Sequence, residues 1–412
     1  MSSALTVSVV IVSRERPAAL RRCLTALAQQ FFHPFEVVVV TDRAGREAVA
    51  SLPSASKARL VAFDEANISE ARNLGIGASA GEIVAFIDDD AVPEPTWLQF
   101  LVAPFARAEV DAAGGFVRGR NGISWQSRGA WVDGSGAPHP LDLPEHGASL
   151  LRGRPGRGLK TEGTNMALRR DWLVRNGGFD PRFRYFLDET DLNMRLAAAG
   201  AVTALVPMAQ VHHGFAESAH RRADRVPRNL FEIGASWAVF LSKHCPDTRR
   251  KAAWREILGN ERRRLLRHMI GGALEPRDVG RLMSGLEAGY LAGQDRVEKG
   301  ASMPPLPRST EPFTAYTNTP PVASVAFAGR WWSCRSLTRD AAAAVASGRV
   351  ATVLCMSHTA LFHKVRFVSG GWWEQSGGLF GRSERLQPLF RLTTLSRRKS
   401  LEIDRTREAR GL

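Results

Sequence analysis

The sequence is poor in cysteine, with Cys23, Cys245, Cys334 and Cys355 as its only four in 412 residues. They lie far apart and lack CxxC spacing, so we expect neither a disulfide framework nor a zinc site. That pattern is typical of a reducing, cytoplasmic environment. The longest apolar runs are strand-sized, well short of the roughly 18 residues that a membrane helix needs. No basic stretch precedes an apolar one at the start, so we expect no signal peptide.

Acidic residues are also in deficit. The chain has 56 Lys and Arg against 41 Asp and Glu, a net charge of +15, and the excess lies largely after residue 150. Such a balance fits phosphorylated substrates, an anionic membrane surface or merely solvated faces. No RRM, KH or zinc-finger pattern is present, so we expect no specific nucleic-acid partner.

A chain of this length exceeds one compact core, and about two or three domains are expected. Strands and helices alternate through the first hundred residues, which predicts a mostly parallel α/β sheet flanked by helices. The expected parts are an α/β domain at 1–215, a basic helical segment at 216–302, a linker at 303–321 and a small α/β region at 322–412.

Three carboxylates, Asp88, Asp89 and Asp90, directly follow the buried-strand candidate Ile83–Ile87. They would emerge at the carboxyl end of a strand, where open α/β sheets bind ligands. Crowded like charges repel unless a cation neutralises them. Oxygen ligands of this kind suit Mg²⁺ or Mn²⁺, although a solvated acidic turn would look the same in isolation.

Further motifs follow in order along the chain. They are VSVVIV-Ser13-Arg14, EVVVV-Thr41-Asp42, the segment from Asn67 to Gly75, the acid triplet, Gly177-Gly178-Phe179-Asp180 and Asp188-Glu189-Thr190-Asp191-Leu192. Their order and spacing resemble the family 2-like inverting glycosyltransferases of the GT-A fold. The resemblance covers residues 5–215 and does not reach the last two hundred or so.

The resemblance implies roles for residues near a nucleotide. Asp42 matches the acid that hydrogen-bonds the nucleobase or ribose, and Ser13 and Arg14 would line the same pocket. Arg72 matches a position beside the nucleotide, where a guanidinium suits a diphosphate or a uracil carbonyl. Alternatively, Asp42 only caps a turn and Arg72 pairs with a surface acid.

The resemblance also implies a metal site. Asp88 and Asp90 match a DxD pair, one facing the ribose and the other holding the metal on the diphosphate, and Asp89 between them can contact metal or sugar. Some relatives place a metal-binding histidine about two dozen residues past the base. His212 and His213 both fit this spacing, and we favour His212 slightly.

The second acid cluster would supply the base, because inverting transfer needs a carboxylate to take the proton of the acceptor hydroxyl. In the family's Glu-Asp-x-Asp-Leu pattern the base position falls on Glu189, where the usual residue is Asp. We therefore expect Glu189, then Asp188, as the base, with Asp191 holding the local structure. Acids in a first helical turn are also common as simple helix-capping groups.

These features predict an enzyme that transfers a sugar from a UDP- or dTDP-linked donor to a glycan or lipid-linked acceptor, in cell-surface polysaccharide synthesis. We expect it in the cytoplasm, with peripheral contact at the membrane. Nucleotidyl transfer is disfavoured because the first strand lacks a Gly-rich loop with Lys. A basic membrane- or nucleic-acid-binding protein with a non-catalytic transferase-like core is the alternative, and the presence of both acid clusters argues against it. The sequence gives no chemical assignment for the C-terminal region, which is either a packed structural appendage, the favoured interpretation, or a small accessory domain that contacts acceptor or partner.

Overall fold

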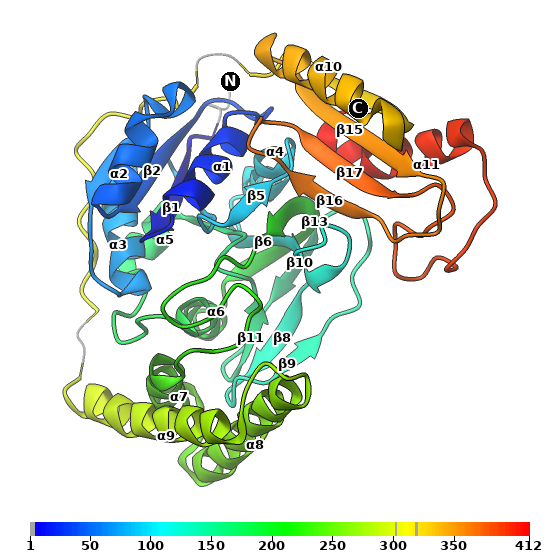
Figure 1. Ribbon diagram of the computed structural model, residues 1–412. Helices are drawn as coiled ribbons and strands as arrows, with labels where there is room; N and C mark the ends of the chain where they lie inside the picture. The colour runs from blue at the N-terminus through cyan, green and yellow to red at the C-terminus, as the bar shows by residue number, and fades with distance from the viewer. Residues whose placement is uncertain (1–4, 301–302, 318–319) are drawn as a thin grey trace.

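A ten-stranded sheet forms the centre of the computed structural model, which describes residues 5–300, 303–317 and 320–412 (Figure 1). The main strand order is β10-β13-β6-β12-β4-β1-β2-β3, with β5 paired to β13 and β7 paired to β6. Its strands are β1 (Val7–Ser13), β2 (Phe35–Thr41), β3 (Arg59–Ala62), β4 (Ile83–Phe86), β5 (Ala91–Pro93), β6 (Val110–Arg118), β7 (Trp125–Ser127), β10 (Ser149–Arg152), β12 (Met166–Arg169) and β13 (Val202–His213).

The half of the sheet from β4 to β3 is parallel, as the alternation of strands and helices predicted. β1 is almost entirely buried because its β-branched residues pack on both faces of the sheet. Val7 pairs with Ile83 and Val10 with Phe86, so β1 and β4 run in step toward their carboxyl ends. This register brings Ser13 beside the acids that follow β4.

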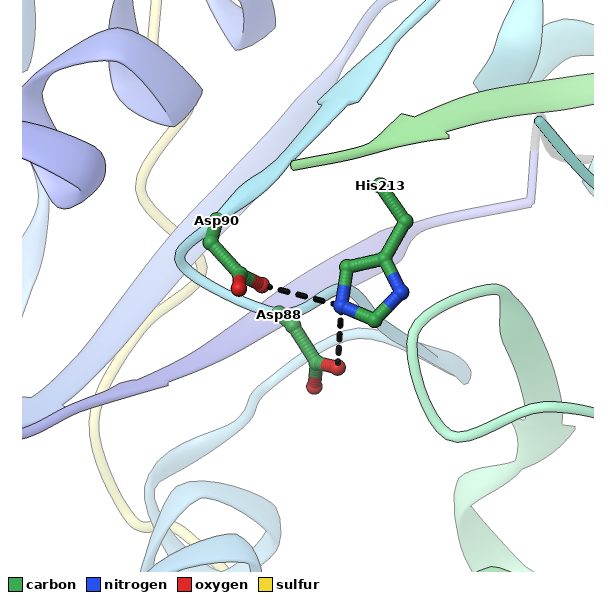
Figure 2. A group of neighbouring side chains, drawn as sticks. All are labelled: Asp88, Asp90 and His213. Atoms are coloured by element: carbon green, nitrogen blue, oxygen red, sulfur yellow. Dashed lines mark ion pairs between the residues drawn. The ribbon is translucent and has the colours of Figure 1, made fainter. Parts of the chain in front are cut away.

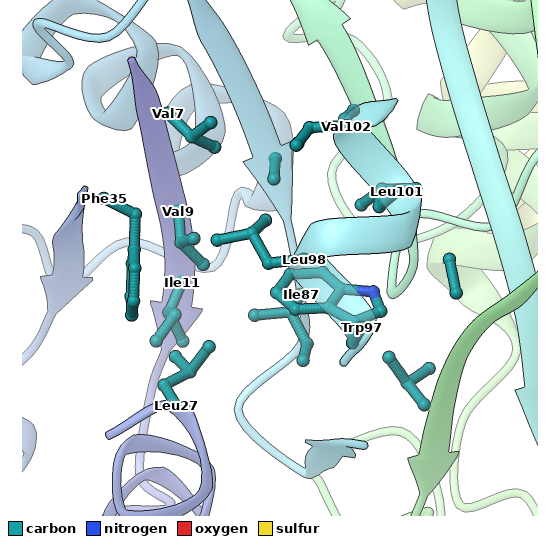
Figure 3. Close-up of a cluster of buried hydrophobic side chains, with 14 of the residues drawn as sticks. Val7, Val9, Ile11, Leu27, Phe35, Ile87, Trp97, Leu98, Leu101 and Val102 are labelled. Carbon is teal, nitrogen blue, oxygen red and sulfur yellow. The ribbon is translucent and has the colours of Figure 1, made fainter. Parts of the chain in front are cut away.

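Helices cover both faces of the sheet, and alternate residues of β1 enter different cores. Val7, Val9 and Ile11 belong to one core, which also contains Trp97 (Figure 3). Val10 points to the other. The flanking helices are α1 (Pro17–Leu27), α2 (Arg43–Ala50), α3 (Ile68–Ala78), α4 (Trp97–Val102), α5 (Arg170–Arg175) and α6 (Asp188–Ala198), with 3₁₀ turns η1 (Pro53–Ala55) and η2 (Ala103–Ala106).

Helix α3 lies unusually close to β1. A Cβ atom at Gly75 would fall 2.4 Å from Val10 Cγ1, so only glycine permits this approach. The helix is capped by Asn67, whose side chain accepts a hydrogen bond from Glu70 N at 3.2 Å. Ser69, in the first turn of this helix, donates its hydroxyl to Phe183 O at 2.6 Å.

A three-stranded antiparallel sheet and a helical segment complete this part of the chain. The sheet has the order β11 (Arg157–Lys160), β8 (Ala130–Asp133), β9 (Pro138–Pro140). The helices are α7 (Phe231–His244), α8 (Asp247–Ile270) and α9 (Pro276–Glu298). Gly234 and Gly289 let α7 and α9 touch, since a Cβ at either would lie within about 2 Å of a carbonyl oxygen on the other helix. No helix among the described residues is long and apolar enough to cross a membrane.

The segment from Met303 onward returns to the N-terminal core without regular secondary structure. Leu306 N donates to Val174 O at 2.9 Å, and Tyr316 N donates to Phe35 O at 2.8 Å. The Tyr316 ring is buried in the core shared by α1 and β2, and its hydroxyl donates to Leu24 O at 3.2 Å. This part of the predicted linker is therefore packed against the domain along its described length.

The C-terminal region is a four-stranded sheet in the order β14-β15-β17-β16. Its elements are β14 (Ser324–Arg330), η3 (Trp331–Ser333), α10 (Cys334–Ala346), β15 (Val350–Ser357), β16 (Lys364–Phe367), β17 (Trp373–Gly378) and α11 (Leu395–Arg410). Strands β14, β15 and β17 are parallel, and β16 is antiparallel to β17.

Cys334 and Cys355 form a disulfide, with 5.8 Å between their Cα atoms, which corrects the expectation of no disulfide. The two cysteines are 21 residues apart, at the start of α10 and near the end of β15. The crossover from β14 through α10 to β15 brings them together, and no local spacing signals such a pairing. Cys23 and Cys245 are buried and free.

A buried ion pair joins the C-terminal region to the large sheet. Arg410, at the end of α11, donates to Glu94 Oε2 at 3.0 Å from Nε and to Oε1 at 3.2 Å from Nη2. The guanidinium also lies over the Trp373 ring, 4.5 Å from its centroid. Both partners of the pair are at most 3% exposed. The attachment therefore depends on mutual neutralisation of two desolvated charges.

We expect Arg410→Ala to lower the free energy of unfolding by about 3–5 kcal/mol, because it leaves Glu94 buried without its cation. Urea denaturation followed by circular dichroism measures the change. The matched control is Arg407→Ala on the same helix, whose ion pair with Asp404 is exposed and whose loss should cost less than about 0.5 kcal/mol. Equal denaturation midpoints for the two variants would contradict this account.

Candidate active site

The acid triplet lies where β4 delivers it, and its three side chains have different surroundings. The Asp88 side chain is 29% exposed, whereas those of Asp89 and Asp90 are 0% and 4% exposed. Ser13 donates its hydroxyl to Asp89 Oδ2 at 2.7 Å, and Arg16 Nη2 lies 3.0 Å from Asp89 Oδ1. Burial raises the pKa of Asp89 to about 7, although the Arg16 charge opposes the shift. The contact of Asp89 with metal or sugar stays a prediction; in this structure its buried carboxylate contacts Ser13 and Arg16.

Asp88, Asp90 and His213 offer three ligand atoms within 4.8 Å of one another. His213 Nε2 lies 3.2 Å from Asp90 Oδ1 and 4.0 Å from Asp88 Oδ2, and both carboxylates turn toward it (Figure 2). The other ring nitrogen, Nδ1, is 3.1 Å from Gln126 Oε1, an oxygen that can only accept. A proton on Nδ1 would be held by this contact, and Nε2 would then be free to bind a cation placed between the acids. Two carboxylates and an imidazole nitrogen suit a divalent cation.

The remaining oxygen of Asp90 is fixed by the protein. Ala216 N donates to Asp90 Oδ2 at 2.7 Å, and Arg16 Nη1 lies 3.3 Å from the same atom. Burial alone would raise the pKa of Asp90, but the hydrogen bond and charge of His213, with Arg16, hold it below its ordinary range. Asp90 is therefore a carboxylate whose orientation is set before any ligand arrives.

Of the two histidines, the structure places His213 beside the acids, whereas the sequence slightly favoured His212 as the metal ligand. His213 pairs with Ala91 across β5, one residue from Asp90, whereas His212 pairs with Val92. Adjacent residues of a strand point to opposite faces, so only one of them faces the acids. His212 Nε2 instead lies 2.8 Å from Glu94 Oε1, and burial lowers the pKa of His212.

Arg72, on α3, joins the two acid clusters. Its guanidinium is ion-paired with Asp188, and Nη2 lies 3.2 Å from Asp88 Oδ1. Burial tends to lower the pKa of Arg72, but the charges of Asp188 and Asp88 raise it overall. Its contact with a nucleotide stays a prediction; in this structure it neutralises one carboxylate of each cluster.

The second acid cluster opens α6, after Leu187 in the left-handed conformation at φ 66°. Asp191 is fully buried and ion-paired with Arg195 Nε at 2.8 Å and Lys243 Nζ at 2.5 Å. Burial alone would raise the pKa of Asp191, but His244, Arg195 and Lys243 hold it below its ordinary range. These contacts tie α6 to α7.

Glu189, next to Asp188, is half-buried and accepts a hydrogen bond from the Thr190 hydroxyl at 3.3 Å. Burial and then the Asp188 charge raise the pKa of Glu189 to about 8, with Lys160 opposing. Within the described part of the chain, no Lys or Arg forms a salt bridge with Glu189. It is thus an acid near its titration midpoint at mildly alkaline pH.

A cavity of about 730 Å³ opens in front of the metal-binding candidates and has walls of opposite charge. Asp88, Asp90 and Glu162 contribute to its acidic side. The loop after β13 contributes Arg221 and Arg225. Arg221 Nη2 lies 3.6 Å from Asp90 Oδ2. Such a pocket suits a ligand with anionic and neutral parts.

Arg225 lies in unusually basic surroundings. Its guanidinium stacks over the Phe215 ring at 4.1 Å. Burial and then the charges of Arg221, Arg120 and Arg264 lower the pKa of Arg225. Clustered guanidinium groups repel one another, so an anion bound among them would be stabilised.

The residues expected near the nucleotide lie in two environments. Ser13 and Arg14 line the cavity, and Arg14 Nε is 3.1 Å from Asp64 Oδ1. Asp42 caps α2 by accepting from Gly45 N at 2.8 Å, and it also accepts from Glu15 N at 2.7 Å. Both of its oxygens are therefore engaged by backbone groups, and its contact with a nucleobase stays a prediction.

The sequence alone predicts no role in the site for Arg16, Glu162 or Arg221. Arg16 balances the acid triplet from the loop after β1. Glu162 reaches the cavity wall while paired with Lys160 Nζ at 2.6 Å. The basic run of Arg221 and Arg222 was visible in the sequence, but nothing there tells which arginine turns toward the acids.

The mixed, largely parallel α/β sheet, with paired acids after β4 that face a cavity, agrees with the predicted GT-A fold. Residues 8–173 match the model of the family described as "Glycosyl transferase family 2". This part of the chain is a family 2-like glycosyltransferase domain, which confirms the resemblance seen in the sequence.

Individual relatives agree with this family. The O-antigen biosynthesis protein RfbC of Myxococcus xanthus is 33% identical over 233 residues, 54% of this chain and 18% of that protein. The glucosyl-dolichyl phosphate glucuronosyltransferase of Haloferax volcanii is 29% identical over 191 residues, 43% of this chain and 56% of that protein. The chain thus spans about a fifth and just over half of these two relatives.

Solved structures with a similar chain course include GalNAc-T7 with UDP, GalNAc and Mn²⁺. It has 17% identity and a TM-score of 0.45, and the match covers 59% of this chain and 48% of that one. The Pyrobaculum calidifontis mannosyltransferase PcManGT in complex with GDP-Man and Mn²⁺ has 18% identity and a TM-score of 0.44. That match covers 72% of this chain and 89% of that one.

We expect His213→Ala to weaken Mn²⁺ binding about tenfold or more, because it removes the nitrogen that faces Asp88 and Asp90. Isothermal titration calorimetry with Mn²⁺ measures the affinity. His139→Ala is the matched control, since His139 lies on a solvent-exposed strand paired with Asp133 and should leave binding unchanged. Wild-type affinity in His213→Ala would exclude this histidine as a ligand.

Proposed function

We propose that the protein is a metal-dependent, inverting glycosyltransferase. It would move a sugar from a UDP- or dTDP-linked donor to a hydroxyl group of a glycan or lipid-linked acceptor. The observation that carries the proposal is the linkage of two acid clusters by Arg72, where the first cluster lines the cavity through Asp88 and Asp90. One cluster has the geometry of a cation site, and the other contains an acid near its titration midpoint.

The donor's diphosphate fits between the two walls of the cavity. Asp88, Asp90 and His213 would hold Mg²⁺ or Mn²⁺, which supplies charge neutralisation to the departing diphosphate. Arg221 and Arg225 face the same space and would take up its remaining negative charge. The fixed orientation of Asp90 lowers the reorganisation needed when the donor binds.

Glu189 is the better candidate for the base. Asp188 is ion-paired with the buried Arg72, so its carboxylate is already engaged by the protein. Glu189 has a pKa of about 8, close to the range in which a general base works well. Its carboxylate would take the proton of the acceptor hydroxyl as the new glycosidic bond forms.

The biological setting is part of the proposal. The likeness to a protein named for O-antigen biosynthesis supports a role in cell-surface polysaccharide synthesis. A lipid-linked acceptor would require the enzyme to work at the cytoplasmic face of a membrane. The net charge of +15 favours peripheral contact with anionic lipid there.

We expect Glu189→Gln to keep donor binding and to lose transfer by about 100-fold or more, since the amide cannot accept the proton. A screen of UDP- and dTDP-sugars with Mn²⁺ first identifies a hydrolysed donor, and calorimetry and product formation then separate binding from turnover. Glu47→Gln, an exposed acid paired with Arg43, is the control. Persistent transfer in Glu189→Gln with loss in Asp188→Asn would move the base to Asp188, and no donor turnover at all would reject the proposed function.

We expect kcat to rise with pH through about 8, because Glu189 must lose its proton to act and its pKa is about 8. Lys160 lowers that pKa, so Lys160→Met should move the rise to higher pH. Initial rates at saturating donor and Mn²⁺, measured from about pH 6 to about pH 9, record both profiles. A flat wild-type profile, or a Lys160→Met rise at lower pH, would contradict this assignment.

A further inference from the structure

The C-terminal sheet gathers exposed apolar side chains at one end. Strands β14, β15 and β17 are parallel, so the connections that leave their carboxyl ends emerge together. We call these connections the C-terminal tip; they comprise residues 330–335, 358–364 and 379–394. Eight large apolar side chains in the tip are between 51% and 99% exposed: Trp331, Trp332, Leu361, Phe362, Leu386, Leu389, Phe390 and Leu392.

The concentration of these side chains is unusual for a folded surface. Fifteen large hydrophobic residues are exposed in the described chain, and eight of them belong to the tip. Exposed apolar side chains gathered in this way mark an interaction site in soluble proteins. Figure 1 shows the connection from β17 to α11 as an orange-to-red loop that extends away from the sheet.

The second and third connections of the tip are hydrogen-bonded to each other. Phe380 N donates to Thr359 O at 3.0 Å, and His363 N donates to Arg382 O at 3.0 Å. The Arg382 guanidinium stacks over the Phe362 ring at 4.2 Å. The Cys334–Cys355 disulfide fixes the first connection to β15. A braced surface loses little conformational entropy when it binds.

The charges of the tip are mostly positive, which favours an anionic partner. The three connections carry Arg330, Arg335, Lys364, Arg382, Arg385 and Arg391, and Glu384 is their single acid. Tryptophan, leucine and phenylalanine interleaved with arginine are the composition of surfaces that insert into the headgroup region of a bilayer. Basic side chains near such a surface are attracted by anionic lipid.

We infer that the C-terminal tip is a membrane-docking surface that inserts its apolar side chains into a bilayer containing anionic phospholipid. None of its residues lines the cavity of the candidate active site. The inference therefore does not depend on the proposed chemistry, and it gives the C-terminal region a function that sequence reasoning did not assign.

The test is co-sedimentation of the full chain with vesicles of phosphatidylglycerol and phosphatidylcholine, compared with phosphatidylcholine alone. The wild type should bind the anionic vesicles, and added salt should weaken binding. Leu386→Ser/Leu389→Ser/Leu392→Ser should lower the partition coefficient at least tenfold. The control Ile270→Ser/Leu291→Ser/Val322→Ser removes equally exposed apolar side chains from other surfaces and should bind as the wild type does.

Two further measurements separate the alternatives. Trp331→Phe/Trp332→Phe should remove the blue shift in tryptophan emission that vesicles induce, and donor hydrolysis in solution should be unchanged in every tip variant. The inference is overturned if the wild type ignores anionic vesicles or if both triple variants bind equally. It is also overturned if light scattering shows that the tip pairs two copies of the chain and vesicles do not compete.

Discussion

Negative charge concentrated at the carboxyl end of β4 is the constraint around which this molecule is built. Three consecutive carboxylates cannot share one strand end without cations, and the protein supplies them from separate segments. Arg16 comes from the loop after β1 and Arg72 from α3. In the proposed function, Asp88, Asp90 and His213 would together hold a divalent cation. The segments that pack against the sheet therefore also supply the positive charges that balance these acids.

Strand β13 connects that site to the rest of the chain. Its last two residues face opposite ways, so His213 meets the acids while His212 meets Glu94. Glu94 in turn is held by Arg410 from α11. The C-terminal sheet is therefore attached one residue away from the candidate metal ligands. Loss of the Glu94–Arg410 attachment would disturb the candidate metal site through the backbone of β13.

The predictability of each feature follows the range of the interactions that produce it. The buried run Ile83–Ile87 and the acids behind it are local, so strand, edge and charge could be predicted together. The choice of His213 over His212 depends on the register of β13 against β5. The disulfide of Cys334 depends on a crossover between parallel strands. Pairings of this kind join segments that are distant in the sequence, so local sequence patterns cannot predict them.

Tyr316 gives the chain an order of assembly. Its ring fills the core between α1 and β2, although nearly three hundred residues separate it from its hydrogen-bond acceptor Leu24 O. On the ribosome the amino-terminal strands and helices emerge first. The core position of Tyr316 would stay empty until this later segment leaves the exit tunnel. Nascent chains would therefore expose apolar surface through most of translation, which makes the first domain a natural client of chaperones during synthesis.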